Sequence, residues 1–154
     1  YPDDLELSSV PEYLAKLKIE PALSELKRSE ILIAADTIVL FENEILGKPK
    51  DRDQARDFIK RMCNSNHDVI TGVCIQTIDS QHLFSVTSKV QFAIFTEDEI
   101  DYYVDNYEPY DKAGAYGIQD WIGWTKIKSI KGSYSNIMGL PMHEVYEAIN
   151  SITS

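Results

Sequence analysis

The stretch over residues 31–41 is apolar except for Asp36 and Thr37 near its centre. Its length and its β-branched residues favour a strand over residues 30–40 that is buried on both faces. A carboxylate in such a strand is costly unless it is hydrogen-bonded, paired with a cation or bound to a metal. The alternative is that the strand ends at Ala35 and that Asp36 only caps a turn.

The remaining sequence alternates between helix and strand patterns. Helices are expected to begin after the capping residues Ser9, Asp51 and Thr96, and a last helix is expected over residues 141–149. Pro21 should interrupt the first of these helices. Strands are expected over residues 45–46, 69–78, 82–95 and 124–130, with a hairpin turn at residues 79–80. This alternation predicts a single α/β domain over residues 1–154, with a mixed sheet.

The charge balance limits the partners of the chain. The sequence has 15 Lys and Arg against 25 Asp and Glu, a net charge of −10, which argues against binding to nucleic acid or to an anionic membrane surface. A small anionic substrate needs only a local basic pocket and is not excluded. Cys63 and Cys74 are interpreted as buried thiols of a reducing compartment rather than as a disulfide or a metal pair.

Two further segments are candidate parts of a site. Lys48 lies between Gly47 and Pro49, a setting that suits a phosphate, although a solvated turn lysine is the alternative. Lys112 and Gln119 flank a loop of small residues, where the Gln amide could read the edge of a base, although an ordinary glycine loop is the alternative. The three histidines show no catalytic spacing and are interpreted as structural or surface residues (His67, His82 and His143).

Several short stretches carry a family resemblance when they are taken in order. They are residues 34–39 (Ala-Ala-Asp-Thr-Ile-Val), 47–49 (Gly-Lys-Pro), 67–73 (His-Asp-Val-Ile-Thr-Gly-Val), 112–119 (Lys-Ala-Gly-Ala-Tyr-Gly-Ile-Gln), 132–136 (Gly-Ser-Tyr-Ser-Asn) and 139–141 (Gly-Leu-Pro). Together they resemble the Maf family of nucleoside triphosphate pyrophosphatases over nearly the whole chain.

The resemblance implies a two-lobed domain with a mixed, partly antiparallel twisted sheet flanked by helices and a nucleotide cleft between the lobes. It implies hydrolysis of dTTP and UTP to the monophosphate and pyrophosphate, as house-cleaning of the nucleotide pool, with Mg²⁺ or Mn²⁺ as a cofactor. The implied site comprises Asp36 as catalytic base or metal ligand, Lys48 and Lys112 as catalytic lysines, and Lys18, Thr37 and Gln119 as substrate-binding residues. It also implies a cytoplasmic protein and, from the family alone, a homodimer.

Two features depart from the family pattern. The family begins with a strand, a Ser-x-Ser-Pro-Arg-Arg segment and an acidic pair, whereas this sequence begins at the stretch that follows them. We therefore expect the chain to lack a first strand and a phosphate-binding loop, and to bind triphosphate weakly without the two arginines. Residues 65 and 66 read Ser-Asn where Ser-Gly is usual. The alternative function is that of a regulatory or interaction protein, linked to septum formation, that binds a nucleotide without hydrolysing it.

Overall fold

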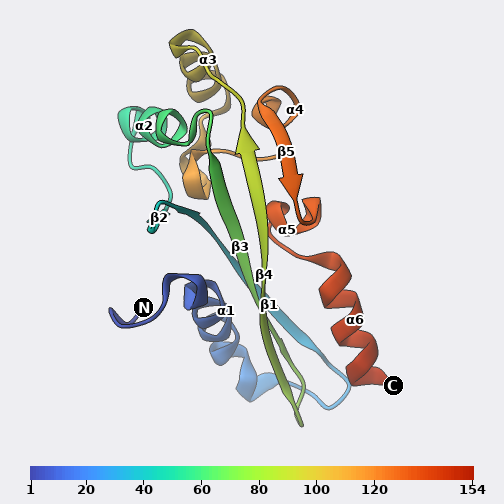
Figure 1. The fold of residues 1–154 in the computed structure, drawn as a ribbon. Helices are drawn as coiled ribbons and strands as arrows, with labels where there is room; N and C mark the ends of the chain where they lie inside the picture. Colours follow the sequence, from blue (N-terminus) through green and yellow to red (C-terminus); the bar gives the residue numbers. More distant parts are fainter.

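A computed structural model describes residues 1–154. Its centre is one five-stranded sheet in the order β2-β1-β3-β4-β5 (Figure 1). The strands are β1 (Leu32–Phe41), β2 (Glu44–Leu46), β3 (Asn66–Gln76), β4 (Gln81–Phe92) and β5 (Ile127–Lys131). The predicted α/β class is confirmed. The hairpin between β3 and β4 also forms as predicted, with Gln76 paired to Gln81.

Every strand pairing in the sheet is antiparallel, so the expectation of a mixed sheet is corrected. The reason lies in the connections between the strands. Tight turns reverse the chain between β1 and β2 and between β3 and β4. β2 and β3 both run opposite to β1, which lies between them. The helical connection from β4 to β5 returns the chain to the end of the sheet that it left, so β5 runs opposite to β4 (Figure 1).

The helices form two groups around the sheet. They are α1 (Val10–Ile19), α2 (Arg52–Met62), α3 (Glu97–Tyr107), α4 (Trp121–Thr125), α5 (Tyr134–Met138) and α6 (Met142–Thr153), with 3₁₀ helices at Leu7–Ser9, Glu20–Glu25, Pro109–Asp111 and Ala113–Ala115. In Figure 1, α2, α3 and α4 lie at one end of the sheet, whereas α1 and α6 flank its long strands at the other. No helix is long and apolar enough to cross a membrane.

The hydrophobic core is divided in the same way. The largest cluster joins α2 and α3 to the nearby strand ends and includes Phe58, Ile59 and Phe92. At the other end the sheet is covered on both faces, since α1 packs beside Ile38 and Ile70 and α6 packs beside Val73 and Ile75. We call these two halves the helical lobe and the sheet lobe. The two-lobed arrangement agrees with the expectation from the family.

All three predicted helix starts are confirmed, but side-chain capping is confirmed at only two of them. The Asp51 side chain accepts a hydrogen bond from the backbone of Gln54, and Thr96 and Glu99 form a complete capping box. The Ser9 side chain makes no capping bond, because the chain already turns helically through Leu7–Ser9 before α1 begins. Pro21 does interrupt the helix, and a 3₁₀ segment replaces it after Ile19.

The predicted strand over residues 124–130 is too long. Residues 121–125 form α4 instead, and the strand begins at Ile127. The hydroxyl of Thr125 donates to the carbonyl of Trp121, so its β-branched side chain supports the helix turn. Similarly, the loop expected at residues 132–136 contains α5, which Ser133 caps by accepting from the backbone of Asn136.

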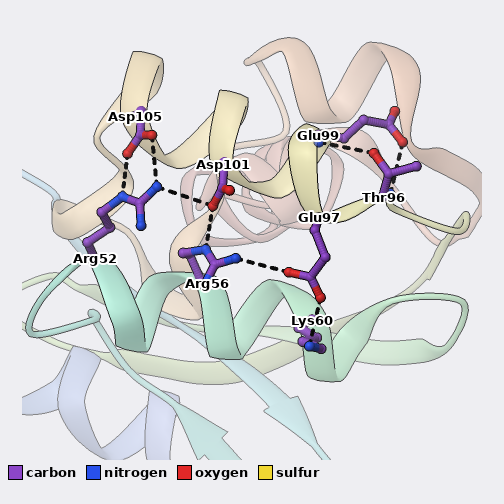
Figure 2. Close-up of polar contacts among 8 residues, drawn as sticks. All are labelled: Arg52, Arg56, Lys60, Thr96, Glu97, Glu99, Asp101 and Asp105. Atoms are coloured by element: carbon purple, nitrogen blue, oxygen red, sulfur yellow. Dashed lines mark hydrogen bonds and ion pairs between the residues drawn. The ribbon is translucent and has the colours of Figure 1, made fainter.

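A row of ion pairs fixes α3 against α2 (Figure 2). Basic residues one helix turn apart on α2 meet acidic residues one turn apart on α3. Arg52 binds Asp105 and Asp101, Arg56 binds Asp101 and Glu97, and Lys60 binds Glu97, with N···O distances of 2.5–3.2 Å. Each exposed pair contributes little alone. Together the pairs hold α3 in one register against α2. This matters for the candidate site because α3 carries Tyr103, which is hydrogen-bonded to Gly117.

Candidate active site

A cavity of about 410 Å³ lies between the helical lobe and the sheet lobe. Its volume falls within the range of roughly 300–1,000 Å³ that is usual for small-molecule sites. Residues predicted from four separate segments line this one cavity: Lys18, Asp36, Thr37, Lys48, Lys112 and Gln119. The structure therefore brings together all six residues of the predicted site.

Asp36 lies within β1, so the interpretation that the strand ends at Ala35 is wrong. β2 pairs only with Val39–Phe41, so residue 36 has a neighbouring strand on one side only, where it faces Gly72 of β3. The Asp36 side chain is 20% exposed, and Oδ1 lies 2.5 Å from Nζ of Lys18. Lys18 also donates to the carbonyl oxygen of Ala35 over 2.9 Å. The carboxylate in the apolar strand is thus paired with a cation at the edge of the sheet.

Gly72 explains how Lys18 comes to this position. A Cβ atom at residue 72 would lie 2.2 Å from backbone atoms of Pro11 and Glu12. The backbone of α1 therefore rests directly on β3, on the face toward which Asp36 also points. A larger residue at position 72 would lift α1 and move Lys18 away. No local sequence signal indicates this packing role of Gly72.

Lys48 and Lys112 come from two loops that contact each other. The backbone N–H of Gly114 donates to the carbonyl of Gly47 over 3.1 Å, which ties the glycine loop to the segment that holds Lys48. Nζ of Lys112 lies 3.1 Å from a carboxylate oxygen of Asp111, and this hydrogen bond lowers the pKa of the Asp111 carboxyl. Three lysines and two aspartates line the cavity, so it carries local positive charge within an acidic protein.

Tyr103 of α3 holds the segment that carries Gln119. Its hydroxyl accepts from the N–H of Gly117 over 3.0 Å and donates to a carboxylate oxygen of Asp120 over 2.9 Å. Burial raises the pKa of Tyr103, so the hydroxyl stays neutral. The sequence presents Tyr103 as one position of an apolar helix stripe, and no signal there indicates that its hydroxyl binds the loop.

His67 supports the same loop from the core. His67 is 2% exposed, and its Nε2 lies 2.6 Å from the hydroxyl of Tyr116, which lines the cavity. Burial lowers the pKa of His67 to about 4, an effect that Asp68 opposes and Lys89 reinforces. The imidazole is therefore neutral at physiological pH. His67 does not itself line the cavity, in agreement with its interpretation as a structural residue.

Thr37 points to the opposite face of β1 from Asp36, because successive side chains of a strand alternate. Its hydroxyl oxygen lies 2.8 Å from that of Thr71 on β3. The hydroxyl of Thr71 donates in turn to the backbone carbonyl of Asn136 over 3.0 Å. Gly139 lies beside Thr37, and a Cβ atom there would come within 3.6 Å of the Thr37 oxygen. Thr37 thus lies at the boundary between the cavity and a buried polar network.

The donor set of the cavity suits only one kind of metal site. No group of three or more His, Cys, Asp and Glu side chains in the chain could enclose a metal ion. Asp36 and Asp111 are the carboxylates that line the cavity. Mg²⁺ is commonly held by one or two carboxylates together with substrate phosphates and water. The residues therefore fit a cation that is shared with a bound phosphate, and they do not fit a site made by the protein alone.

The sequence is similar to a known family and to several named relatives. Residues 3–152 match the family model described as Maf-like protein. The dTTP/UTP pyrophosphatase of Bacteroides thetaiotaomicron is 44% identical over 152 residues, which cover 99% of this chain and 79% of the relative. The dTTP/UTP pyrophosphatase of Flavobacterium johnsoniae is 45% identical, with 99% and 78% covered. That of Porphyromonas gingivalis is 45% identical over 151 residues, with 97% and 76% covered.

Proposed function

The chain belongs to the Maf family, and from this premise we propose that it hydrolyses dTTP and UTP to the nucleoside monophosphate and pyrophosphate. The observation that carries the proposal is the cavity between the lobes. It places two carboxylates, one of them that of Asp36, and three lysines beside a loop that ends in a glutamine. Its relatives that are 44–45% identical are named dTTP/UTP pyrophosphatases.

The main obstacle to this reaction is the negative charge of the triphosphate, which the lysines would offset. The triphosphate is strongly anionic, and more negative charge develops on pyrophosphate as it leaves. Catalysis of phosphoryl chemistry therefore depends mostly on positioning and on electrostatic stabilisation. Lys48 and Lys112 would neutralise the phosphates from the helical lobe, and Lys18 would do so from the sheet lobe. As point charges they interact with phosphate rather than with the base.

Asp36 would act as the general base. Its carboxylate takes a proton from water while the water oxygen bonds to the α-phosphorus and the bond to the bridging oxygen breaks. Pyrophosphate then leaves. Lys18 holds the carboxylate in place through their 2.5 Å contact. A bound Mg²⁺ or Mn²⁺, held by Asp36 together with phosphate oxygens, would supply further neutralisation of the triphosphate.

Gln119 and Thr37 would bind the base. Uracil and thymine present a 4-oxo acceptor beside an N3–H donor, and a Gln amide can satisfy both. The amide of Gln119 can also rotate to suit cytosine, which reverses this pattern. Discrimination therefore needs a second partner whose polarity is fixed, and Thr37 is the candidate.

The test is to incubate the purified protein with Mg²⁺ or Mn²⁺ and a panel of common and modified nucleoside triphosphates. Phosphate is then measured with and without added inorganic pyrophosphatase. We expect phosphate release from dTTP and UTP only when pyrophosphatase is present, since cleavage falls between the α- and β-phosphates. In H₂¹⁸O the label should appear in the monophosphate.

Release of phosphate without added pyrophosphatase would mean cleavage at the terminal phosphate and would refute the proposed bond. Tight binding of dTTP or UTP with no pyrophosphate release would favour the regulatory protein instead. A homodimer and a cytoplasmic location remain predictions.

A further inference from the structure

The direction of the hydrogen bond between Thr37 and Thr71 follows from their neighbours. A hydroxyl group has one hydrogen to donate. Thr71 uses its hydrogen on the carbonyl oxygen of Asn136, which can only accept. In the 2.8 Å contact between the two threonine hydroxyls, Thr37 must therefore be the donor. With its hydrogen directed at Thr71, Thr37 offers only oxygen lone pairs to a ligand in the cavity.

The surroundings hold this direction in place. Thr37 and Thr71 are directly opposite each other in the β1–β3 register, and both Thr71 and Asn136 are 0% exposed. The Asn136 side chain donates to the carbonyl of Val69 over 3.2 Å and to the hydroxyl of Ser88 over 3.0 Å. Reversing the Thr37–Thr71 bond would take the Thr71 hydrogen away from the Asn136 carbonyl. Losing a hydrogen bond inside a buried polar network is costly, so the direction from Thr37 to Thr71 is favoured.

The geometry points to Thr71 as a positioning residue that fixes Thr37 as a hydrogen-bond acceptor, and so makes the site select bases with an N3–H donor. Uracil and thymine have this hydrogen, whereas cytosine has a lone pair at N3 that would face the Thr37 oxygen. The inference deepens the proposed function, on which it rests, because it supplies the partner of fixed polarity that Gln119 lacks. Gly139 leaves the space beside the Thr37 oxygen free of a side chain.

The test is Thr71→Val, which keeps the shape of the residue and removes its hydroxyl. The Asn136 carbonyl still accepts from the N–H of Gly139 over 3.0 Å, so the fold should survive. Thr37 could then turn its hydrogen toward the cavity and donate to cytosine. We expect the ratio of kcat/KM for UTP to that for CTP to fall at least about tenfold, mainly because CTP improves. Thr71→Ser restores the hydroxyl and should keep the wild-type ratio.

Two outcomes would overturn the inference: a wild-type ratio near one, or an unchanged ratio in Thr71→Val. If the ratio is unchanged because turnover of both nucleotides falls equally, Thr71 only stabilises the fold. If Thr71→Val does not fold, Thr37→Val provides the second variant, and it should lower UTP turnover far more than CTP turnover. An equal loss in that variant would also refute the inference.

Calorimetric binding of UMP and CMP separates this inference from the proposed function. The same change of ratio in binding, without any turnover by the wild type, would support the role of Thr71 and refute the pyrophosphatase activity. Normal turnover of UTP, with the same UTP-to-CTP ratio in the wild type and both variants, would support the pyrophosphatase activity and refute the role of Thr71.

Discussion

Lowering the pH from 7 to 5 should reduce the free energy of unfolding through His67. Burial lowers the pKa of His67 from 6.5 to about 4, so between these values the unfolded chain binds a proton that the folded chain does not. The stability from this group is therefore present above pH 6.5 and is lost as the pH falls toward 4. Linkage over the interval from pH 7 to 5 gives a loss of about 2 kcal/mol.

The structure gives two reasons for this low pKa. The imidazole lies among Phe92, Tyr116 and other core residues, where a charge is poorly solvated. Its Nδ1 atom is buried without a hydrogen-bond partner, so protonation would leave a buried N–H unsatisfied. The pH interval also isolates this group. The carboxyl groups whose pKa is lowered by neighbouring cations lose their contribution only near and below their ordinary values (Glu44, Glu97, Glu99, Asp105 and Asp111).

The measurement is urea unfolding at pH 7 and pH 5 for the wild type and for His67→Gln. The Gln amide can still bond to the Tyr116 hydroxyl, but it does not titrate. With a denaturant slope of about 1–3 kcal/mol per molar urea, the wild-type midpoint should fall by roughly 1 M more than that of the variant. Equal pH dependence in the two proteins would refute the reasoning, because His67 would then titrate alike in the folded and unfolded states.

Three further substitutions test how the cavity is built. Gly72→Ala should destabilise the protein by about 3 kcal/mol in urea unfolding, because the added Cβ would meet the backbone at Pro11; a neutral effect would contradict the close packing of α1. Tyr103→Phe leaves the buried N–H of Gly117 without its partner, so it should cost about 1–3 kcal/mol and raise KM for dTTP, and wild-type values for both would exclude Tyr103 as a support of the loop. Lys48→Ala should reduce kcat/KM for dTTP roughly 10- to 100-fold without changing thymidine binding; an equal effect on thymidine would place Lys48 away from the phosphates.

The sequence predicted the elements whose signals are local. The capping residues Asp51 and Thr96 accept hydrogen bonds from residues three positions ahead, and both helices begin where predicted. The turn after Gln76 depends on polar residues within a few positions, and it also forms where predicted. Asp36 could be singled out because a carboxylate in an apolar strand is costly by itself, whatever the tertiary fold.

Other features could not be predicted because they depend on packing between distant segments. The fit of α1 over Gly72 joins residues about 60 positions apart, as does the contact between Thr71 and Asn136. Aromatic residues such as Tyr103 and Trp124 are common both in strands and on the apolar faces of helices. Their residue type therefore predicts neither the helix at Trp124 nor the hydrogen bond of Tyr103 to the loop. The direction of β5 depends on where α4 returns the chain to the sheet, which no local pattern encodes.

The most direct test of the central claim is the rate of pyrophosphate release from dTTP by Asp36→Asn. The substitution keeps the shape of the side chain and an oxygen that can accept from Lys18, but it removes the basic carboxylate. Loss of a positioned general base lowers the rate about 10²–10⁴-fold, and we expect a loss of this size with unchanged urea unfolding. Asp79→Asn, at the exposed turn between β3 and β4, serves as the matched control and should keep wild-type turnover. Near-native turnover by Asp36→Asn would contradict the account, because Asp36 would then be only a structural partner of Lys18.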